Sequence, residues 1–289
     1  MANNDRETIG FIGTGVMGAS MAGHLLDAGY ALRVHNRTPS KAEGLVARGA
    51  VWADTVAELA AASDVVIAIL GYPEDVETVF LGARGAVTHA RPGTYLVDMT
   101  TSRPELACRI ADAAETQGAR ALDAPVSGGD RGAREGTLSI MVGGEPQAFE
   151  AMRPIFNCMG GNIVHQGATG SGQRAKLANQ LAVAGTMLGV CEAMAYARKA
   201  GLDPRTVLRS IENGAAGSWT LSNLAPRMLD GDFAPGFYVK HFIKDLRIAK
   251  ESAETELPGL DLVLSRYETL AESYGGEDGT QALFRLYDG

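Results

Sequence analysis

A lysine stands near the start of a long apolar segment, in the stretch GSGQRAKLANQ at residues 170–180. Lys176 is followed by Asn179 and Gln180, which at i+3 and i+4 share one face of a helix with it. A lysine whose pKa is lowered by burial or by a nearby cation can give a proton to an oxygen or take one from it. A lone lysine at a helix start is more often a solvated charge, so other motifs must show whether Lys176 has a chemical role.

A glycine motif in the first residues indicates nucleotide binding. The stretch GFIGTGVMG at residues 10–18 contains G-x-G-x-x-G, directly after an expected strand at residues 8–12 and at the start of an expected helix at residues 17–28. Such a turn lets the N–H groups of a helix start bind a pyrophosphate, and the alternative is a glycine-rich turn without a ligand. The residues expected to bind the cofactor here are Gly13, Thr14, Gly15, Val16, Met17 and Gly18.

The end of the second expected strand indicates which dinucleotide binds. Sites that prefer NAD usually place Asp or Glu there, where it bonds the ribose 2′-hydroxyl. This chain has Asn36, Arg37 and Thr38 instead, and Arg37 can form a fork to a 2′-phosphate. NADP(H) is therefore expected over NAD(H), unless Arg37 is merely an exposed side chain.

A second glycine cluster lies in DAPVSGGDRGAREGTLSIMVGG at residues 123–144. Ser127, Gly128 and Gly129 would present backbone N–H groups and one hydroxyl, which suit a small carboxylate. Taken alone, a Ser-Gly-Gly sequence is usually only a turn.

The elements that must position these residues change in type along the chain. Strand-like and helix-like runs alternate in the first half, which predicts a parallel sheet with helices on both faces. Expected strands are residues 8–12, 31–35, 51–53, 65–70, 95–97, 120–122 and 138–144, and expected helices are 17–28, 41–48, 56–61, 76–80 and 104–117. After Gly170 the spacing is helical, beginning with a long helix at about residues 173–200. We predict an α/β fold with a Rossmann-type domain at residues 1–169, joined by this helix to an all-α domain at residues 170–289.

Composition limits the partners and the location. The net charge of −8 argues against a broad nucleic-acid-binding surface. The apolar run at residues 177–197 contains two amides and Glu192, so a buried helix is expected rather than a membrane span. The start MANNDRETIG lacks the pattern of a signal peptide, and three widely spaced cysteines fit reduced thiols in a cytoplasmic protein. The five histidines lack metal-ligand spacing, so no metal site is expected.

Taken together, the motifs resemble one family, the β-hydroxyacid dehydrogenases, over nearly the whole chain. This family includes 3-hydroxyisobutyrate dehydrogenase, tartronate semialdehyde reductase and the glyoxylate/succinic semialdehyde reductases. GFIGTGVMG resembles its cofactor loop, DAPVSGG…GTLSIMVGG its substrate signature, GSGQRAKLANQ its catalytic segment and KHFIKDL (240–246) a later K-D motif. The resemblance implies an NADP(H)-dependent oxidoreductase acting on a CH–OH group of a small carboxylate-bearing hydroxy acid or semialdehyde.

The resemblance also implies roles for individual residues. Lys176 matches the catalytic lysine, which would donate a proton to the carbonyl oxygen during reduction and accept it during oxidation. Substrate-holding positions match Ser127, Gly128, Gly129, Asn179 and Gln180, and cofactor-side positions match Leu70, Thr101, Phe237 and Lys244, which Asp245 follows. The active site is then expected in the cleft between the domains. Two departures are Thr100, where the family has serine, and Asp130 with Arg131 after the Ser-Gly-Gly turn.

Several alternatives stay open. An imine reductase shares the cofactor loop and the N-R-T stretch, but such enzymes usually have Asp or Tyr at the position of Lys176. A non-catalytic NADP-binding sensor or assembly protein would tend to lose this lysine. The substrate and the physiological direction are not specified. A homodimer or homotetramer is expected, mainly from the family resemblance.

Overall fold

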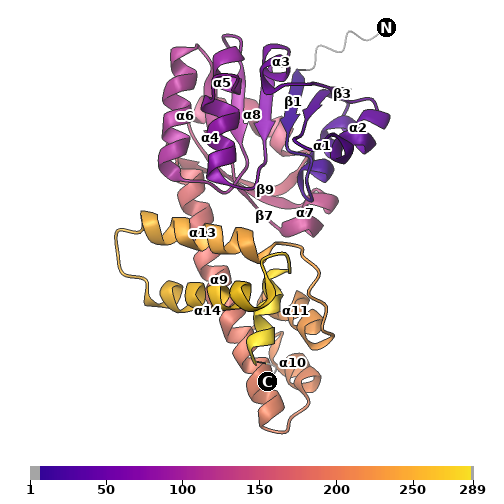
Figure 1. The fold of residues 1–289 in the computed structure, drawn as a ribbon, viewed down its shortest axis with the longest axis vertical. Helices are drawn as coiled ribbons and strands as arrows, with labels where there is room; N and C mark the ends of the chain where they lie inside the picture. The colour runs from indigo at the N-terminus through magenta and orange to yellow at the C-terminus, as the bar shows by residue number, and fades with distance from the viewer. Residues whose placement is uncertain (1–6, 288–289) are drawn as a thin grey trace. The chain divides into compact units, whose positions relative to one another are not determined.

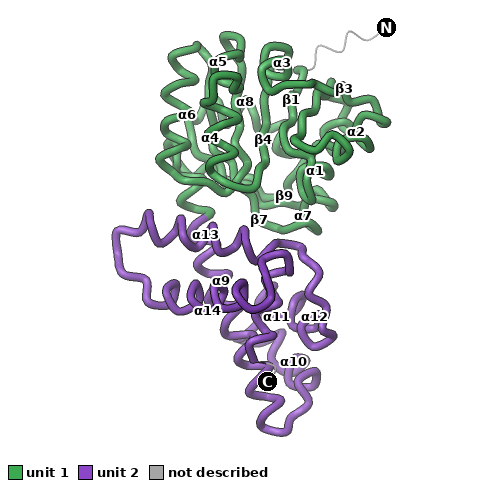
Figure 2. Tube along the Cα trace, viewed as in Figure 1, with its two compact units in different colours: residues 1–176 green, residues 177–289 purple. Residues whose placement is uncertain are grey.

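The computed structural model describes residues 7–287, which group into two compact units (Figures 1 and 2). Unit 1 ends at Lys176 and unit 2 begins at Leu177, so the division falls within one long helix. The domain boundary between residues 169 and 170 stays a prediction. The first six residues of the N-terminal segment, in which no signal peptide is expected, lie outside the described residues.

Unit 1 is built on one sheet. Its strands are β1 (Thr8–Ile12), β2 (Ala31–His35), β3 (Val51–Trp52), β4 (Val65–Ala68), β5 (Tyr95–Asp98), β6 (Arg120–Asp123), β7 (Val126–Ser127), β8 (Leu138–Gly143) and β9 (Gly160–Gly167). Their order is β3-β2-β1-β4-β5-β6-β8-β7, with β9 also paired to β8. The α/β fold with a Rossmann-type first domain and a helical second part is thus confirmed.

The sheet differs from the expected purely parallel one at its far edge. The strands from β1 to β6 pair in parallel, whereas β8 runs antiparallel to β6 and β7 and parallel to β9. The expected strands are present, each within two residues, but β7 and β9 were not expected. β7 is only two residues long, and β9 (GGNIVHQG) mixes glycine with polar residues, so neither has the apolar run that marks a buried strand.

Two hydrophobic cores lie on the two faces of the sheet. Along β4, Val65 and Ile67 enter one core while Val66 and Ala68 enter the other, because side chains alternate along a strand. α1 and α8 contribute to the first core, and α3 to α6 to the second. The helices of unit 1 are α1 (Gly18–Asp27), α2 (Glu43–Ala47), α3 (Val56–Ala61), α4 (Pro73–Leu81), α5 (Ala86–His89), α6 (Pro104–Thr116), α7 (Gly129–Glu135) and α8 (Pro146–Phe156), with a 3-10 turn η1 (Pro39–Ala42).

Local sequence explains where these helices begin. Proline occupies the first position of α4, α6 and α8, where its fixed φ suits a helix and its missing N–H has no helical partner. At the start of α3 the N-cap Thr55 accepts the N–H of Glu58, and Glu58 accepts the N–H of Asp54, the residue before the cap. α8, which carries Pro154 near its end, was not expected.

Unit 2 is helical. The long helix α9 (Ser171–Lys199) starts in unit 1 and continues into unit 2, where it is followed by α10 (Pro204–Ile211), α11 (Trp219–Asn223), α12 (Ala225–Leu229), α13 (Val239–Ser252), α14 (Pro258–Tyr274) and the 3-10 segment η2 (Thr280–Tyr287). Its core is formed around Met187, Met194, Phe242 and Tyr267. Within residues 7–287, no helix combines the length and the apolar character needed to cross a membrane.

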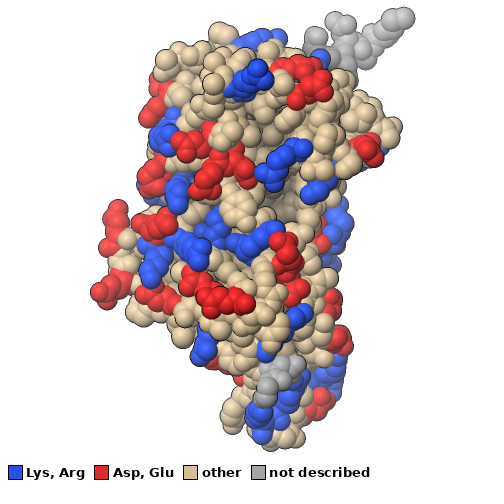
Figure 3. Space-filling model, viewed as in Figure 1, with Lys and Arg blue, Asp and Glu red and all other residues tan. Residues whose placement is uncertain are grey.

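The charged side chains of both signs lie interspersed on the face of the molecule shown in Figure 3. Many form exposed pairs, such as Arg109 with Glu77 and Arg247 with Glu268. Exposed pairs of this kind contribute little to stability.

Candidate functional site

The carboxyl ends of the parallel strands carry most of the site residues predicted for unit 1. β1 lies between β2 and β4, so the chain crosses over at this point in the sheet. In such sheets, ligands bind at the carboxyl edge beside the crossover. Residues 13–18 follow β1, residues 36–38 follow β2, Leu70 follows β4 and Thr101 follows β5.

The glycine loop after β1 has the geometry that a dinucleotide needs. A Cβ on Gly13 would lie 2.1 Å from the Ile69 oxygen, and one on Gly18 would lie 1.9 Å from the Gly13 oxygen. A Cβ on Gly15 would instead meet no atom within 4 Å. Gly13 and Gly18 therefore allow close packing, while Gly15 leaves an open approach to the backbone.

The hydroxyl of Thr14 adds a polar group to this loop. Thr14 is 2% exposed, and its Oγ1 has no hydrogen-bond partner among residues 7–287. Buried polar groups are normally bonded, so an unpaired hydroxyl in a loop of this form fits a phosphate ligand.

The residues after β2 are held beside the glycine loop. The Asn36 side chain accepts the N–H of Thr14 at 3.1 Å and donates to the Thr38 carbonyl at 2.8 Å. The Arg37 side chain is 89% exposed, and its Nη1 lies 3.6 Å from a carboxylate oxygen of Asp75. The guanidinium thus lies at the surface, in a loose ion pair with Asp75 of α4.

Hydrogen bonds connect the segment that follows β4 to the turn that follows β5. The N–H of Leu70 donates to the Thr100 hydroxyl at 2.8 Å, and the N–H of Thr100 donates to Asp98 at 2.9 Å. Leu70 and Thr101, both predicted to lie near the nicotinamide, are therefore held by the same hydrogen-bonded turn.

The first turn of α9 is bonded to the ends of β5 and β6. Asp123, the last residue of β6, accepts the N–H groups of Gly170 and Gln173, each at 2.8 Å. The side chain of Gln173 accepts the N–H of Ser102 and donates to the Thr100 carbonyl, also at 2.8 Å each. We call these four bonds the α9 anchor.

The anchor is buried. Asp123 is 1% and Gln173 0% exposed. Burial raises the pKa of the Asp123 carboxyl, and the N–H groups that bond it act in the opposite direction. Lys176 lies one turn beyond Gln173 and is 7% exposed, so it is not a solvated surface charge.

The Ser-Gly-Gly turn follows β7 and opens α7. Ser127 pairs with Ser139 of β8, and the backbone of Gly128 and Gly129 has φ of 131° and 62°. Residues other than glycine rarely adopt such φ values, which explains why both positions are glycine. The turn is partly exposed.

In unit 2, a buried carboxylate connects three of the predicted residues. Asn179 donates to the Gln180 side-chain oxygen at 2.9 Å, and Gln180 donates to Asp245 at 2.6 Å. The ammonium of Lys244 lies 2.8 Å from the other Asp245 oxygen, as an ion pair without hydrogen-bond alignment. The predicted residue Phe237 makes edge contacts with the rings of Phe242 and His241, 5.9 Å and 6.4 Å away.

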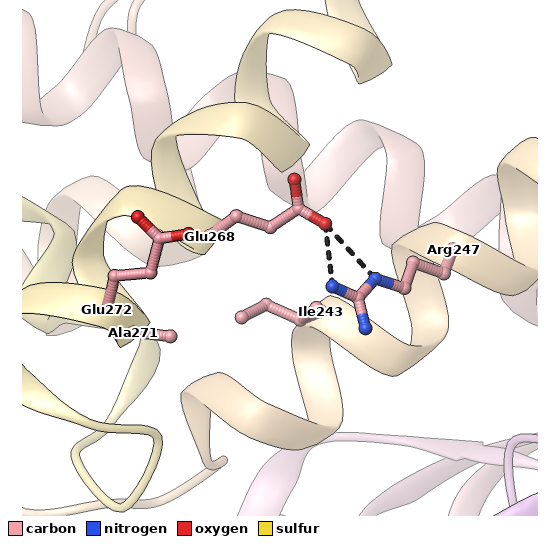
Figure 4. A pocket seen from close by; sticks show the side chains of 5 residues that line it. All are labelled: Ile243, Arg247, Glu268, Ala271 and Glu272. Atoms are coloured by element: carbon pink, nitrogen blue, oxygen red, sulfur yellow. Dashed lines mark hydrogen bonds and ion pairs between the residues drawn. The ribbon is translucent and has the colours of Figure 1, made fainter.

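A cavity of about 500 Å³ in unit 2 contains none of the predicted residues (Figure 4). Ile243, Arg247, Glu268, Ala271 and Glu272 line it. Arg247 bonds Glu268 across it with two nitrogens on one oxygen. This is an exposed ion pair between α13 and α14, and it lacks the convergent buried polar groups of a binding site.

Comparison with known proteins decides the family. A family profile described as the NAD binding domain of 6-phosphogluconate dehydrogenase matches residues 8–167. A second, described as NAD-binding of NADP-dependent 3-hydroxyisobutyrate dehydrogenase, matches residues 170–287. The chain is 50% identical to a probable 3-hydroxyisobutyrate dehydrogenase-like protein of Arabidopsis thaliana, over 95% of this chain and 83% of the relative. The chain belongs to the β-hydroxyacid dehydrogenase family.

Other proteins are similar to this chain in sequence or in structure over nearly its whole length. An uncharacterized oxidoreductase of Bacillus subtilis is 57% identical over 98% of this chain and 99% of its own. The structure of Mycobacterium tuberculosis 3-hydroxyisobutyrate dehydrogenase with L-serine superposes with a TM-score of 0.89 at 31% identity, covering 98% of this chain and 100% of that one. An NAD-dependent L-serine dehydrogenase of Pseudomonas aeruginosa is 38% identical over 97% of each chain. Membership makes this protein an oxidoreductase with a nicotinamide cofactor.

For this β-hydroxyacid dehydrogenase, sequence inspection missed three residues that surround the predicted ones. Asp123 and Gln173 both lie in motifs that we quoted, but their bonding partners are 47 to 73 residues away and follow only from the fold. His241 lies one turn before Lys244, and burial together with Lys244 and Lys240 lowers its pKa. Its presence in KHFIKDL was the available signal.

Proposed function

We propose that this protein transfers hydride between NADP(H) and a small 3-hydroxy acid or its semialdehyde, with Lys176 as the general acid and base. The observation that carries the proposal is the burial of Lys176, one turn beyond a helix start that is hydrogen-bonded to the strand edge bearing the glycine loop. A buried ammonium near a reacting carbonyl can both stabilise developing negative charge and supply a proton.

The proposed residues divide the work as follows. The turn Ser127–Gly129 would bind the substrate carboxylate through its hydroxyl and N–H groups, which orients the neighbouring carbon. In reduction, Lys176 would donate a proton to the carbonyl oxygen, and in oxidation its neutral amine would take the hydroxyl proton. The bound nicotinamide supplies or accepts the hydride. Asn179 and Gln180 are the proposed substrate-side amides, and Phe237 and Lys244 the proposed cofactor-side residues.

The proposed preference for NADP(H) rests on the residues after β2. Asn36 accepts a hydrogen bond from Thr14 of the glycine loop and donates one to the Thr38 carbonyl, and the exposed Arg37 between them can reach a 2′-phosphate. The acidic residue that an NAD-preferring site usually places here is absent from positions 36–38.

We also infer a cytoplasmic homodimer or homotetramer. The free cysteines suit a reducing compartment. On α9, Tyr196 is 74% exposed, and a Cβ on Gly185 or Gly189 would meet no atom within 4 Å, so this stretch of helix has room for a partner. Light scattering after size exclusion would give the mass, and a monomer would contradict the inference.

The function is tested by an activity panel in both directions, in which hydroxy acids are assayed with NADP+ and NAD+, and carbonyl compounds and the imine with NADPH and NADH. It should include 3-hydroxyisobutyrate, 3-hydroxypropionate, L-serine, succinic and tartronate semialdehydes, glyoxylate and one cyclic imine. We expect turnover with at least one of the carboxylates, and a higher kcat/KM with NADPH. Turnover of the imine alone would favour an imine reductase, and NADPH binding without any turnover would favour a sensor.

The role of Lys176 is tested on the best substrate from that panel. We expect Lys176→Ala to lower kcat by about 10²–10⁴-fold while the Kd for NADPH stays unchanged. Lys199→Ala, at the other end of the same helix, is the matched control and should keep its kcat. Near-normal turnover in Lys176→Ala would refute the assignment.

A further inference from the structure

We propose that Gln173, together with Asp123, is a positioning residue that fixes Lys176 relative to the turn bearing Thr101. The inference rests on the proposed function, because it needs Lys176 to be the proton donor. It assigns a role to two buried side chains that do not themselves act on the substrate.

The side chain of Gln173 holds the turn after β5 by both of its polar atoms. Its oxygen accepts the N–H of Ser102 and its nitrogen donates to the Thr100 carbonyl, each at 2.8 Å. Thr101, expected near the nicotinamide, stands between these two residues. Two bonds to a fixed backbone segment allow one orientation of the amide and therefore restrict rotation of α9 about its axis.

Asp123 fixes the same helix turn along its axis. Its two carboxylate oxygens accept the N–H groups of Gly170 and Gln173 at the start of α9. Gln173 is thus held twice, by its backbone to the end of β6 and by its side chain to the end of β5.

Two glycines fix the distance between the helix and the sheet. A Cβ on Gly172 would lie 2.4 Å from the Met141 oxygen, and one on Gly143 would lie 2.5 Å from a carboxylate oxygen of Asp123. The first turn of α9 therefore packs against strand backbone with no side chain between them. The bonds to Asp123 and Gln173 and the close glycine packing together oppose sliding, rotation and separation of the α9 start relative to the sheet.

Lys176 lies close enough to the anchor to depend on it. Three residues of helix advance about 4.5 Å and turn through about 300°, so Lys176 lies one turn beyond Gln173 and near its face. A displacement of about 1 Å at a reacting group can lower a rate about 10²-fold, so loosening the anchor should affect turnover more than binding.

The first test replaces Gln173 with methionine, which keeps the length of the side chain but neither hydrogen bond. We expect Gln173→Met to lower kcat by about 10–100-fold while the Kd for NADPH and the substrate KM change by less than about threefold. In a Lys176→Ala background, the same substitution should cause no further loss, because Gln173 acts through Lys176.

The second test is Gln173→Glu, which makes the anchor dependent on pH. When the introduced carboxyl group is protonated it can still donate to the Thr100 carbonyl, whereas its ionised form repels that carbonyl. Asp98, which accepts the Thr100 N–H, and Asp123, which accepts the N–H of residue 173, are nearby acids that would favour the protonated form of the introduced carboxyl group. We expect kcat of Gln173→Glu, divided by wild-type kcat at each pH, to rise as the pH falls. A ratio that is constant with pH would overturn the proposal, and this test stands even if Gln173→Met does not fold.

Asp203→Ala is the control for loss of hydrogen bonds at the start of another helix. Asp203 accepts the N–H groups of Arg205 and Thr206 at the start of α10 in unit 2, as Asp123 does for α9. The Asp203→Ala substitution should lower Tm and leave kcat unchanged. If Lys176→Ala is inactive but Gln173→Met keeps wild-type kcat, only the positioning role fails. If Lys176→Ala is active, the proposed function itself fails, and the positioning role fails with it.

Discussion

Gln180 donates a hydrogen bond from its side-chain amide to the buried carboxylate of Asp245 over 2.6 Å. Because a carboxylate only accepts, this bond fixes which way the Gln180 amide points. The Gln180 oxygen then accepts from Asn179 at 2.9 Å, which fixes the Asn179 amide as well. One acid on α13 thus sets the orientation of two proposed substrate-side amides on α9.

We expect Asp245→Ala to lower the free energy of unfolding by about 3 kcal/mol, because it removes the buried carboxylate that accepts from the Gln180 amide and forms an ion pair with the largely buried Lys244 ammonium. Urea unfolding followed by circular dichroism measures this. The control is Asp261→Ala, which removes an exposed ion pair with Lys250 and should cost less than about 1 kcal/mol. Equal losses in the two variants would contradict a structural role for Asp245.

We expect Gly15→Ala to weaken NADPH binding by about tenfold or more without lowering the Tm of the ligand-free protein. The added methyl group meets no atom within 4 Å in the protein, but it would occupy the space through which a pyrophosphate approaches the loop. Fluorescence titration and thermal unfolding give the two values. Gly44→Ala in α2, which also meets no neighbour, should leave the NADPH affinity unchanged, and unaltered NADPH affinity in Gly15→Ala would argue against phosphate binding at this loop.

We expect Arg37→Ala to raise the KM for NADPH by about 10–100-fold and to leave the KM for NADH within about twofold, since only NADPH carries the 2′-phosphate. Steady-state kinetics with both cofactors measure the ratio. Arg91→Ala is the control, because Arg91 pairs with Asp64 at the amino edge of the sheet. Equal changes for the two cofactors would mean that Arg37 does not read the phosphate.

Much of the fold follows from local patterns, whereas the anchor of α9 does not. The strand β4 was predicted from a short apolar run, and the glycine loop from its place between strand and helix. The roles of Asp123 and Gln173 depend on strands that pair far apart in sequence, so no spacing rule predicts them. β9 was missed because its pairing with β8, rather than its composition, makes it a strand.

We expect the free energy of unfolding to fall as the pH drops below about 6.5 because of His241. Burial, Lys244 and Lys240 lower the pKa of this histidine in the folded protein. The unfolded chain therefore takes up the proton first, and the stabilisation present above the unfolded pKa is lost as the pH falls towards the folded one.

His241→Gln removes the titrating group and should flatten this dependence by no more than about 1 kcal/mol, since the ring is only partly buried. Urea unfolding between pH 5 and pH 8 measures the slope for both proteins. An identical slope in the variant would show that other groups cause the pH dependence.

The long separations within the α9 anchor also bear on how the chain folds. Its bonds join residues 47 to 73 positions apart, so the first turn of α9 gains its partners only after β5 and β6 have joined the sheet. Pairing strands that lie far apart in sequence is slow compared with forming a helix. We therefore expect the segment bearing Lys176 to become helical early and to acquire its fixed place late. The amide protons of Gly170, Gln173 and Ser102 then report directly on completed assembly of the sheet, since they can exchange with solvent freely until that step.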